Sequence, residues 1–444
     1  MRSRSRRTRP ARTVPMAAVD VPVALLGYGT VGAAVNRLLI ENGDEIERAT
    51  GHRIRVVRAL VRDQARERSF PAGDDLLTTD FESICSDPSI ALVAEVMGGV
   101  EPAADYVLQL LRAGKPVVSA NKQLIARRGP EIFRVASEEG VQLRFEASVC
   151  AAIPLIKVLR ESLVATNVHR VLGIVNGTTN FILTRMEAGV GYGEALAEAQ
   201  QLGYAETDPT DDVSGADAAA KMAILATVAF GARVGLEDVL YEGIEQVRPE
   251  HVEAARELDM TVRLVGAATL ADGGFDVRVQ PAFVDRRHPL AAVEGAFNAV
   301  MLQGDAIREI TLEGPGAGGV ETASAVVADM VSVVGTAATG FLHNDAAWRT
   351  LPRLPPGDLR SRYYVRIEVD DRPGVLAHVA EQLAAQGVSI ARLAQRQLPD
   401  GASLDLVTHE APSGRVEAAL ATVAELAEVK GAPTLMRVIS ERGV

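Results

Sequence analysis

The stretch "VPVALLGYGTVGAAVNRLLI" (21–40) decides the fold expected for the first part of the chain. Its first six residues form a continuous apolar run, which is typical of a parallel strand covered on both faces. Gly27, Gly29 and Gly32 then form a G-x-G-x-x-G pattern that leads into an amphipathic helix. In this pattern the glycines permit a tight turn, backbone approach to a pyrophosphate, and close helix–strand packing, respectively. The stretch therefore predicts a Rossmann dinucleotide-binding unit, with the phosphates at the helix N-terminus.

Further apolar strands follow at "IRVVRALV" (54–61), "IALVAEVMGG" (90–99) and "KPVVSANK" (115–122), separated by helical segments. We therefore expect a doubly wound parallel sheet whose strand ends carry the ligand loops. The second strand ends at Arg62, with Asp63 behind it. An arginine at this place accommodates the 2′-phosphate of NADP, whereas a carboxylate favours NAD. We favour NADP over NAD, with a solvated charged loop as the alternative interpretation.

A second informative stretch is "GYAETDPTDDVSGADAAAKMAIL" (203–225), in which Lys221 is the lone cation of an apolar run. Lys221 lies four residues after Asp217, so both side chains share one helix face. An ordinary surface ion pair has the same spacing, but the apolar residues after Lys221 indicate burial. A carboxylate beside a buried ammonium raises the lysine pKa that burial lowers, which yields a usable proton donor.

Upstream, "VHRVLGIVNGTTNFILTRM" (168–186) is an apolar strand that breaks at a polar turn, residues 176–180, before another helix. Plain helix capping explains such a turn as well as a site does. After the proline-rich segment "LPRLPPGDLRS" (351–361), the strand and helix pattern restarts in the order βαββαβ. That order predicts a C-terminal ferredoxin-like domain.

The bulk composition of the 444 residues excludes several classes of protein. The formal net charge of −12 argues against a nucleic-acid binder or a binder of anionic membranes. The longest uncharged apolar stretch, residues 330–342, is too short to cross a bilayer. Cys85 and Cys150 form neither a disulfide framework nor a metal-binding spacing, which fits a reducing cytoplasm.

The first fifteen residues carry six arginines and no acidic residue. This segment has three competing interpretations: a nucleic-acid arm, an organellar transit peptide and an idle extension. It lacks the apolar periodicity of a transit helix, and Met16 directly precedes the first strand. We interpret residues 1–18 as a disordered basic tail or the product of an upstream start site.

Together these motifs resemble those of the homoserine dehydrogenases that carry a C-terminal ACT domain. The matching segments are "GYGTVG", "SANK", "NGTTNFIL", the 203–225 stretch, "GPGAGG", "TASAVVAD" and "DRPGVLA", in family order between about residues 20 and 444. The resemblance implies NAD(P)H-dependent, reversible reduction of L-aspartate 4-semialdehyde to L-homoserine, in threonine and methionine biosynthesis.

The resemblance also implies roles for individual residues. Lys221 matches the catalytic proton donor and acceptor, Asp217 its partner carboxylate, and Lys122 a lysine near nicotinamide and substrate. The residues implied to bind substrate are Glu206, Asp212, Gly177 and Thr178. The residues expected at the cofactor are Gly27, Tyr28, Gly29, Thr30, Val31, Gly32, Arg62, Gly98, Lys122 and Gly318. The residues implied to bind a monovalent cation, Na⁺ or K⁺, largely through backbone carbonyls, are Glu146, Val149, Ala151 and Ile153.

Two positions depart from the family pattern. The cation loop resembles one that is richer in glycine, and the Cβ atoms of Val149, Cys150 and Ala151 restrict its backbone. Glu321 replaces a proline before "TAS" and adds a negative charge near the cofactor edge, which opposes the argument for NADP from Arg62.

The C-terminal "DRPG" turn offers backbone amides at a helix start, which suit an amino-acid carboxylate. We expect Asp371 and Gly374 to bind a regulatory ligand, with threonine as the natural effector. A dimerisation domain without a ligand is the alternative. The resemblance suggests a homodimer or homotetramer.

The expected organisation is α/β throughout, in three domains. Residues 19–145, completed by about 311–345, form the NAD(P)-binding Rossmann domain, and 146–310 form an α/β catalytic and dimerisation domain. Residues 351–362 form a linker, and 363–444 form the ferredoxin-like ACT regulatory domain. Two other functions were weighed: a non-catalytic sensor of nucleotides and amino acids, and a dehydrogenase of a related amino-acid semialdehyde. A sensor has no need of a proton donor such as Lys221.

Overall fold

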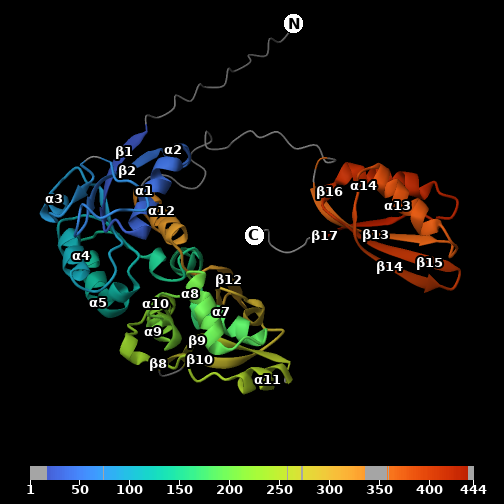
Figure 1. The fold of residues 1–444 in the computed structure, drawn as a ribbon. Coiled ribbons are helices and arrows are strands. Elements are labelled where there is room, and N and C mark those ends of the chain that lie inside the picture. Colours follow the sequence, from blue (N-terminus) through green and yellow to red (C-terminus); the bar gives the residue numbers. More distant parts are fainter. Residues whose placement is uncertain are drawn as a thin grey trace, which may run out of the picture. The chain divides into compact units, whose positions relative to one another are not determined.

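The computed structural model describes residues 18–73, 75–257, 259–271, 274–335, 358 and 360–438. The chain divides between Ala347 and Trp348 into two compact units, each with its own core (Figure 1). Residues 1–17 of the expected tail lie outside the described residues, as does the expected linker apart from residues 358 and 360–362.

The first sheet is the parallel sheet that the glycine motif predicts. Its strands are β1 (Val19–Leu26), β2 (His52–Leu60), β3 (Leu77–Thr78), β4 (Leu92–Glu95), β5 (Val117–Ser119) and β6 (Leu143–Arg144). They lie in the order β3-β2-β1-β4-β5-β6, and all neighbours are parallel. The chain order reverses at β1 and β4, the point at which doubly wound sheets bind ligands.

Helices cover both faces of this sheet. They are α1 (Thr30–Glu41), α2 (Gly43–Thr50), α3 (Glu82–Cys85), α4 (Ala103–Arg112), α5 (Lys122–Glu138) and the later α12 (Gly319–Gly335). Successive side chains of β1 point to opposite faces. Val23 and Leu25 join a core with α1 and α12, whereas Ala24 and Leu26 join the core of α4 and α5. This explains why β1 is apolar at every position rather than at alternate ones.

The second sheet is mixed. Its strands are β7 (Val168–Ile174), β8 (Val239–Tyr241), β9 (Met260–Ala271), β10 (Gly274–Asp285), β11 (Phe297–Gly304) and β12 (Ile310–Pro315). They lie in the order β12-β11-β7-β9-β10-β8, antiparallel except for the pair of β10 and β8. The first unit also contains three short helical turns: η1 (Glu146–Ser148), η3 (Leu236–Asp238) and η4 (Pro289–Ala292).

The helices of the second sheet include the one that carries Lys221. They are α6 (Leu155–Lys157), which continues into the π-helical turn η2 (Val158–Ser162), α7 (Gly177–Glu187), α8 (Tyr192–Gln201), α9 (Thr210–Val213), α10 (Ala216–Phe230) and α11 (Pro249–Glu257). Residues 217–226 of α10 are all buried. A helix that is apolar nearly all round belongs in a core, so Lys221 is held inside the protein.

The second unit is the expected βαββαβ domain with one added short strand. Its elements are β13 (Arg360–Val369), α13 (Val375–Ala385), β14 (Ile390–Leu398), β15 (Gly401–Thr408), β16 (Ala411–Pro412), α14 (Ser413–Ala424) and β17 (Thr434–Val438). The sheet is antiparallel, in the order β14-β15-β13-β16, with β17 also paired to β13. Its first strand begins at Arg360, three residues before the expected start of the domain.

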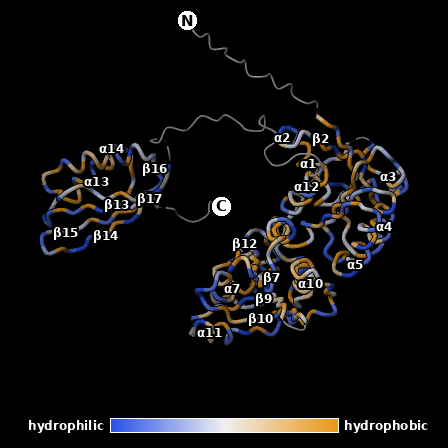
Figure 2. Tube along the Cα trace, turned by 180° about the vertical axis from the view of Figure 1, so that it is seen from behind, coloured by the Kyte–Doolittle hydropathy of each residue, from blue (hydrophilic) through white to orange (hydrophobic). Residues whose placement is uncertain are grey.

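The α/β fold class with a Rossmann sheet, a second sheet and a ferredoxin-like unit is confirmed. Apolar residues lie along the strands of each sheet and on the faces of the helices that pack on them (Figure 2). Across the described ranges, no helix is both long enough and apolar enough to span a bilayer.

Candidate active site

Three segments that are distant in sequence bring the predicted catalytic residues together. Lys122 begins α5, just after β5. Asn176 follows β7 and caps α7, and Asp217 and Lys221 lie in the first turns of α10. Because α10 packs against both α5 and β7, the three segments meet at one cluster of charged groups.

Lys221 is the buried ammonium of this cluster. Its side-chain Nζ lies 2.8 Å from Asp217 Oδ2 and donates to the carbonyl oxygen of Val175 at 2.8 Å. The residue is 8% exposed. An ammonium has three N–H donors, and these two acceptors are the ones it contacts among the described residues. The third N–H is therefore free to reach a substrate atom.

Asp217 is the centre on which the donors converge. Lys122 Nζ donates to Oδ1, while Lys221 and Asn176 Nδ2 both contact Oδ2 at 2.8 Å. Burial alone would raise the pKa of the Asp217 carboxyl, but the two lysines hold it well below its usual value. Burial alone would lower the pKa of the Lys221 ammonium, but Asp217 keeps it above the usual lysine value. The geometry thus favours a charged pair.

Asn176 is a residue of the cluster that sequence reasoning treated only as a helix cap. It does cap α7, because its Oδ1 accepts from the backbone N–H of Thr179 at 2.8 Å. Its Nδ2 also donates to Asp212 Oδ1 at 2.7 Å and to Asp217 Oδ2 at 2.8 Å. The sequence feature that could have indicated this second role is the polar turn after an apolar strand, in a chain that also has an aspartate-rich segment.

Asn176 thus forms a hydrogen-bonded bridge between Asp212 and Asp217. Some of the predicted substrate residues lie around this bridge. Asp212 is half-buried, and burial together with the neighbouring Asp217 raises its pKa. Gly177 allows close packing, since a Cβ there would lie 2.5 Å from the carbonyl oxygen of Ala296. Thr178 donates through its hydroxyl to the carbonyl of Tyr204 at 2.6 Å.

Glu206 lies apart from this bridge, on the exposed segment between α8 and α9. Its backbone carbonyl accepts from Gln200 Nε2 at 3.1 Å, and its carboxylate has no hydrogen-bond or ion-pair partner among the described residues. The carboxylate is thus available to an incoming cation.

The glycine turn has the geometry that its sequence pattern predicts. Gly27 has φ 104°, and a Cβ there would lie 2.9 Å from the carbonyl oxygen of Val96. A Cβ on Gly32 would lie 2.3 Å from the carbonyl oxygen of Gly27, so this glycine allows the helix to approach. At Gly29 a Cβ would meet no atom within 4 Å, which leaves open space beside the N-terminus of α1.

The other predicted cofactor residues differ in their access to this space. The ring of Tyr28 is buried and its hydroxyl accepts from Asn36 at 2.8 Å, so only its backbone can face a ligand. Thr30 is exposed and Val31 half-buried at the start of α1. Gly98 and Gly318 have φ values of 73° and 146° in loops after β4 and before α12.

Arg62 lies just beyond β2 and is exposed, without an ion-pair partner among the described residues. Glu321 lies in the first turn of α12, where its side chain occupies the space beside Gly318. The two opposed charges noted in the sequence therefore belong to different elements, Arg62 to the segment after β2 and Glu321 to the start of α12.

Glu95 is a second residue that sequence reasoning missed. Its carboxylate is fully buried at the end of β4 and accepts from Ser119 Oγ at 2.7 Å and from the Met97 backbone at 2.9 Å. Asn121 Nδ2 donates to the same carboxylate at 3.2 Å and to the carbonyl of Gly99 at 2.6 Å. Burial raises the pKa of Glu95. The network ties the glycine loop after β4 to the start of α5, where Lys122 lies.

The predicted cation loop adopts a glycine-like backbone without glycine. Cys150 and Ala151 have φ values of 50° and 23°, in the region that L residues rarely occupy. The Glu146 carboxylate accepts from the backbone N–H groups of Ile156 and Lys157 at 2.8 Å. In the described parts of the chain, no group of three or more His, Cys, Asp or Glu residues is arranged to hold a metal ion.

In the second unit, the predicted regulatory turn precedes α13. Gly374 has φ 95° at the N-cap of this helix, so a glycine is favoured there. Asp371 accepts from Gln395 Nε2 at 3.3 Å. The two predicted residues therefore lie at one end of the ferredoxin-like sheet, at a helix start.

Comparison with known proteins places most of the chain in one enzyme family. The family model described as "Homoserine dehydrogenase" matches residues 154–331. The model of the homoserine dehydrogenase NAD binding domain matches 27–146, and the ACT domain model matches 363–428. A homoserine dehydrogenase of Synechocystis sp. is 40% identical over 439 residues, which cover 95% of this chain and 100% of that protein.

Solved structures give the same result. The crystal structure of a homoserine dehydrogenase from Thiobacillus denitrificans is 41% identical, with a TM-score of 0.70, over 95% of this chain and 98% of that one. A hyperthermophilic archaeal homoserine dehydrogenase in complex with NADPH is 29% identical, with a TM-score of 0.61, over 71% of this chain and 98% of that one. This chain belongs to the homoserine dehydrogenase family, the NAD(P)-dependent enzymes that interconvert L-aspartate 4-semialdehyde and L-homoserine.

Proposed function

We propose that Lys221 is the proton donor when this enzyme reduces L-aspartate 4-semialdehyde to L-homoserine. The observation that carries the proposal is the bonding of the Lys221 ammonium. Two of its N–H groups are held by Asp217 and the carbonyl of Val175, which leaves one to face a substrate. A bound nicotinamide supplies the hydride, and the carbonyl oxygen of the aldehyde then needs a proton. Lys221 Nζ delivers that proton and stabilises the developing negative charge.

The other residues of the cluster hold this lysine in its charged form. Asp217 accepts from three donors, so it orients Lys221 rather than taking a proton itself. Lys122 adds a second positive charge beside the site. In the direction of homoserine oxidation the neutral form of Lys221 is the base, so that direction requires a higher pH.

The acidic residues suit the ammonium group of the amino-acid substrate. Asp212 has one carboxylate oxygen held by Asn176, and the other has no partner among the described residues. The Glu206 carboxylate is exposed. We assign both to the substrate's amino group, with Gly177 and Thr178 forming the turn next to it.

For the cofactor we propose NADPH over NADH. The exposed, unpaired Arg62 supports this choice, because a guanidinium is suited to a ribose 2′-phosphate. The archaeal relative that was solved with NADPH also supports it. Glu321 opposes it through like-charge repulsion, so the preference is expected to be modest.

The residues at the 146–153 loop fit a monovalent cation held by oxygen atoms. Asn298 donates to Cys150 Sγ at 3.4 Å beside this loop, and its Oδ1 is buried without a hydrogen-bond partner among the described residues. A buried oxygen without a hydrogen-bond partner beside this loop supports a site for Na⁺ or K⁺. The backbone carbonyl oxygens predicted to coordinate the ion are those of Glu146, Val149, Ala151 and Ile153. The bound ion would stiffen the loop.

The second unit is proposed as a regulatory domain that takes threonine at the Asp371–Gly374 turn. Gly374 begins α13, and backbone amides at a helix start favour a carboxylate.

We retain a homodimer or homotetramer as the proposed assembly, with residues 146–310 as the catalytic and dimerisation part. We retain a reducing cytoplasm as the proposed location.

The test follows the absorbance of the reduced nicotinamide on addition of aspartate semialdehyde, with NADPH and with NADH. Turnover with a higher kcat/KM for NADPH is expected, and Arg62→Ala should reduce the preference. Equal kcat/KM values for both cofactors would contradict the cofactor assignment. Binding of both cofactors without turnover would instead favour the sensor, and preference for another amino-acid semialdehyde would favour the related dehydrogenase.

A further inference from the structure

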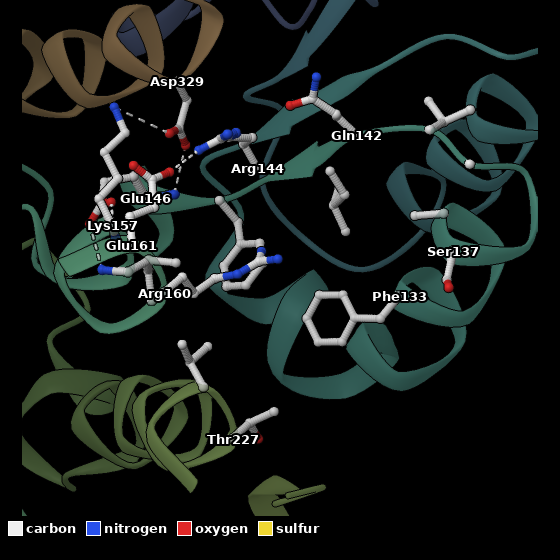
Figure 3. Close-up of a pocket in the computed structure, with 17 residues that line it drawn as sticks. Phe133, Ser137, Gln142, Arg144, Glu146, Lys157, Arg160, Glu161, Thr227 and Asp329 are labelled. Atoms are coloured by element: carbon white, nitrogen blue, oxygen red, sulfur yellow. Dashed lines mark hydrogen bonds and ion pairs between the residues drawn. The ribbon is translucent and has the colours of Figure 1, made fainter. Parts of the chain in front are cut away.

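A cavity of about 930 Å³ opens on the first unit outside the cluster around Lys221 (Figure 3). Its walls come from α5, β6, η1, α6, the turn η2, the last part of α10, and α12. None of the predicted catalytic or substrate residues lines it. We propose that this cavity is a second small-molecule site, and that it takes an organic anion with an apolar or aromatic body.

The apolar wall supplies the surface for the body of such a ligand. Phe133 and Phe145 stack with their ring centroids 5.3 Å apart, and both line the cavity. Val141, Leu143 and Val228 extend this surface. Ligand sites combine an apolar lining with a few polar groups, and the volume lies within their range of about 300–1,000 Å³.

The carboxylates at the polar end of the cavity are already occupied. Glu146 accepts from two backbone N–H groups, and Asp329 accepts from the backbone N–H of Glu146 at 2.8 Å. Arg144 donates to Glu161 at 2.7 Å. Each of these acids thus has a hydrogen-bond or ion-pair partner within the protein, so none faces the cavity as an uncompensated charge.

Arg160 is the group that remains without a partner. It lines the cavity and is exposed, and none of the described carboxylates lies within ion-pair distance of it. In Figure 3 it lies between the charged cluster of Glu146 and Asp329 and the ring of Phe133. An unpaired guanidinium next to an apolar wall is complementary to an anionic head group on an apolar body, because guanidinium binds carboxylate, sulfonate or phosphate with paired donors.

A smaller hollow of about 300 Å³ continues this surface and supports the same charge preference. It shares Phe133, Ser137 and Thr227 with the larger cavity. It adds Arg233, which is exposed and, in the described part of the chain, has no acidic partner. Its other charged residues, Arg134 and Glu138, pair with each other, so the two hollows together present two unpaired arginines beside the shared Phe133.

The cavity also touches elements that hold the active site. Thr227 and Val228 lie on α10, the helix that carries Lys221, and Glu146 begins the loop that leads to Cys150. A bound anion would therefore contact the helix and the loop next to the catalytic lysine, without entering the catalytic cluster.

The test uses 1-anilinonaphthalene-8-sulfonate, an aromatic sulfonate whose fluorescence rises on binding. The full-length protein is titrated with saturating NAD⁺ and NADP⁺ present, so that nucleotide sites are blocked. Saturable binding is expected, weakened about tenfold or more in Arg160→Ala because a charge-assisted bond is lost. Ser137→Trp, a change at an exposed rim residue, should obstruct part of the cavity and weaken binding. Arg112→Ala, at an exposed arginine on α4, is the matched control and should bind as wild type.

Circular dichroism and thermal melting establish that each variant is folded. Equal affinity in wild type, Arg160→Ala and Ser137→Trp would overturn the proposal, because the probe would then bind elsewhere. Absence of saturable binding in wild type would overturn it too. A change of oligomeric state in Arg160→Ala, measured by analytical ultracentrifugation, would show instead that a second copy of the chain covers this surface.

Discussion

Asp217 is the residue on which the active-site cluster depends. It is almost fully buried, and two lysines and one asparagine donate to its two oxygens. A buried carboxylate is tolerated only when its acceptors are satisfied. Since each oxygen is already engaged, we propose that Asp217 holds the charge of Lys221 in place and leaves the proton chemistry to the lysine.

Asn176→Asp tests the bridge between the two aspartates. Aspartate keeps the acceptor that caps α7 but removes the donor and adds a third carboxylate beside Asp212 and Asp217. The added negative charge favours the ammonium form, so the pKa of Lys221 should rise further. We expect kcat to fall by about 10- to 100-fold, and the pH profile of homoserine oxidation to move to higher pH.

Asn176→Ser is the matched control, because serine also caps a helix but adds no charge. It should lower kcat without the upward shift of the pH profile. An unchanged profile in Asn176→Asp would contradict the assignment of Lys221 as the titrating group.

Glu95→Gln tests the buried carboxyl at the end of β4. Burial raises the pKa of Glu95 above its usual value, so the folded state binds a proton more tightly than the unfolded state. The stabilisation is present below the unfolded pKa and is lost as pH rises through the folded pKa. The melting temperature of Glu95→Gln relative to wild type should therefore increase as pH rises above about 4.5, the usual glutamate value.

The comparison requires melting curves of wild type and Glu95→Gln at several values between pH 5 and pH 8. Glu139→Gln, at an exposed carboxylate, should track wild type throughout. A difference in melting temperature that is constant with pH would exclude a shifted titration at Glu95.

At the scale of elements, two glycines in the turn between β1 and α1 serve different purposes, one for packing and one for ligand binding. A Cβ on Gly32 meets the Gly27 carbonyl oxygen at 2.3 Å, whereas a Cβ on Gly29 meets nothing within 4 Å. The backbone of Gly29, at φ −82°, is open to any residue. One glycine thus serves packing, and the other leaves space for a phosphate.

Gly29→Ala and Gly32→Ala form a matched pair on this turn. Gly32→Ala should lower the free energy of unfolding by about 2 kcal/mol, because backbone atoms cannot yield to the new methyl group. Gly29→Ala should leave stability within about 0.5 kcal/mol, while the KM for the cofactor rises about tenfold. Urea unfolding and steady-state kinetics measure the two effects, and a loss of stability in Gly29→Ala with an unchanged KM would contradict the assignment.

Local patterns predicted most of the elements but only part of the site. The apolar run of β1 and the burial of α10 could be predicted, because each is a property of neighbouring residues. The position of Glu95 could not, because its partners Ser119 and Asn121 lie more than twenty residues away and meet it only through the pairing of β4 with β5. Asn176 was recognised as a cap, but its second role depends on α10 packing against β7.

At the scale of the whole molecule, the chain consists of two compact units with separate cores. The cluster around Lys221 is assembled entirely within the first unit. The archaeal relative aligns over 71% of this chain and 98% of its own length. All members of this cluster therefore lie outside the ferredoxin-like unit.

A chain that ends at residue 347 tests this division. Because units with separate cores are expected to fold separately, it should retain kcat within about twofold. Any response of the full chain to threonine should be lost in the shortened chain. A shortened chain that is folded by circular dichroism but inactive would contradict the division.

The most direct measurement is the turnover of aspartate semialdehyde by wild type, Lys221→Met and Lys115→Met. Lys115 is the matched control, because it is 7% exposed, as against 8% for Lys221, and donates only to backbone carbonyls. We predict that kcat falls by about 10³-fold in Lys221→Met, while folded Lys115→Met turns over at the wild-type rate. Equal kcat values in folded Lys221→Met and in wild type would show that another group donates the proton.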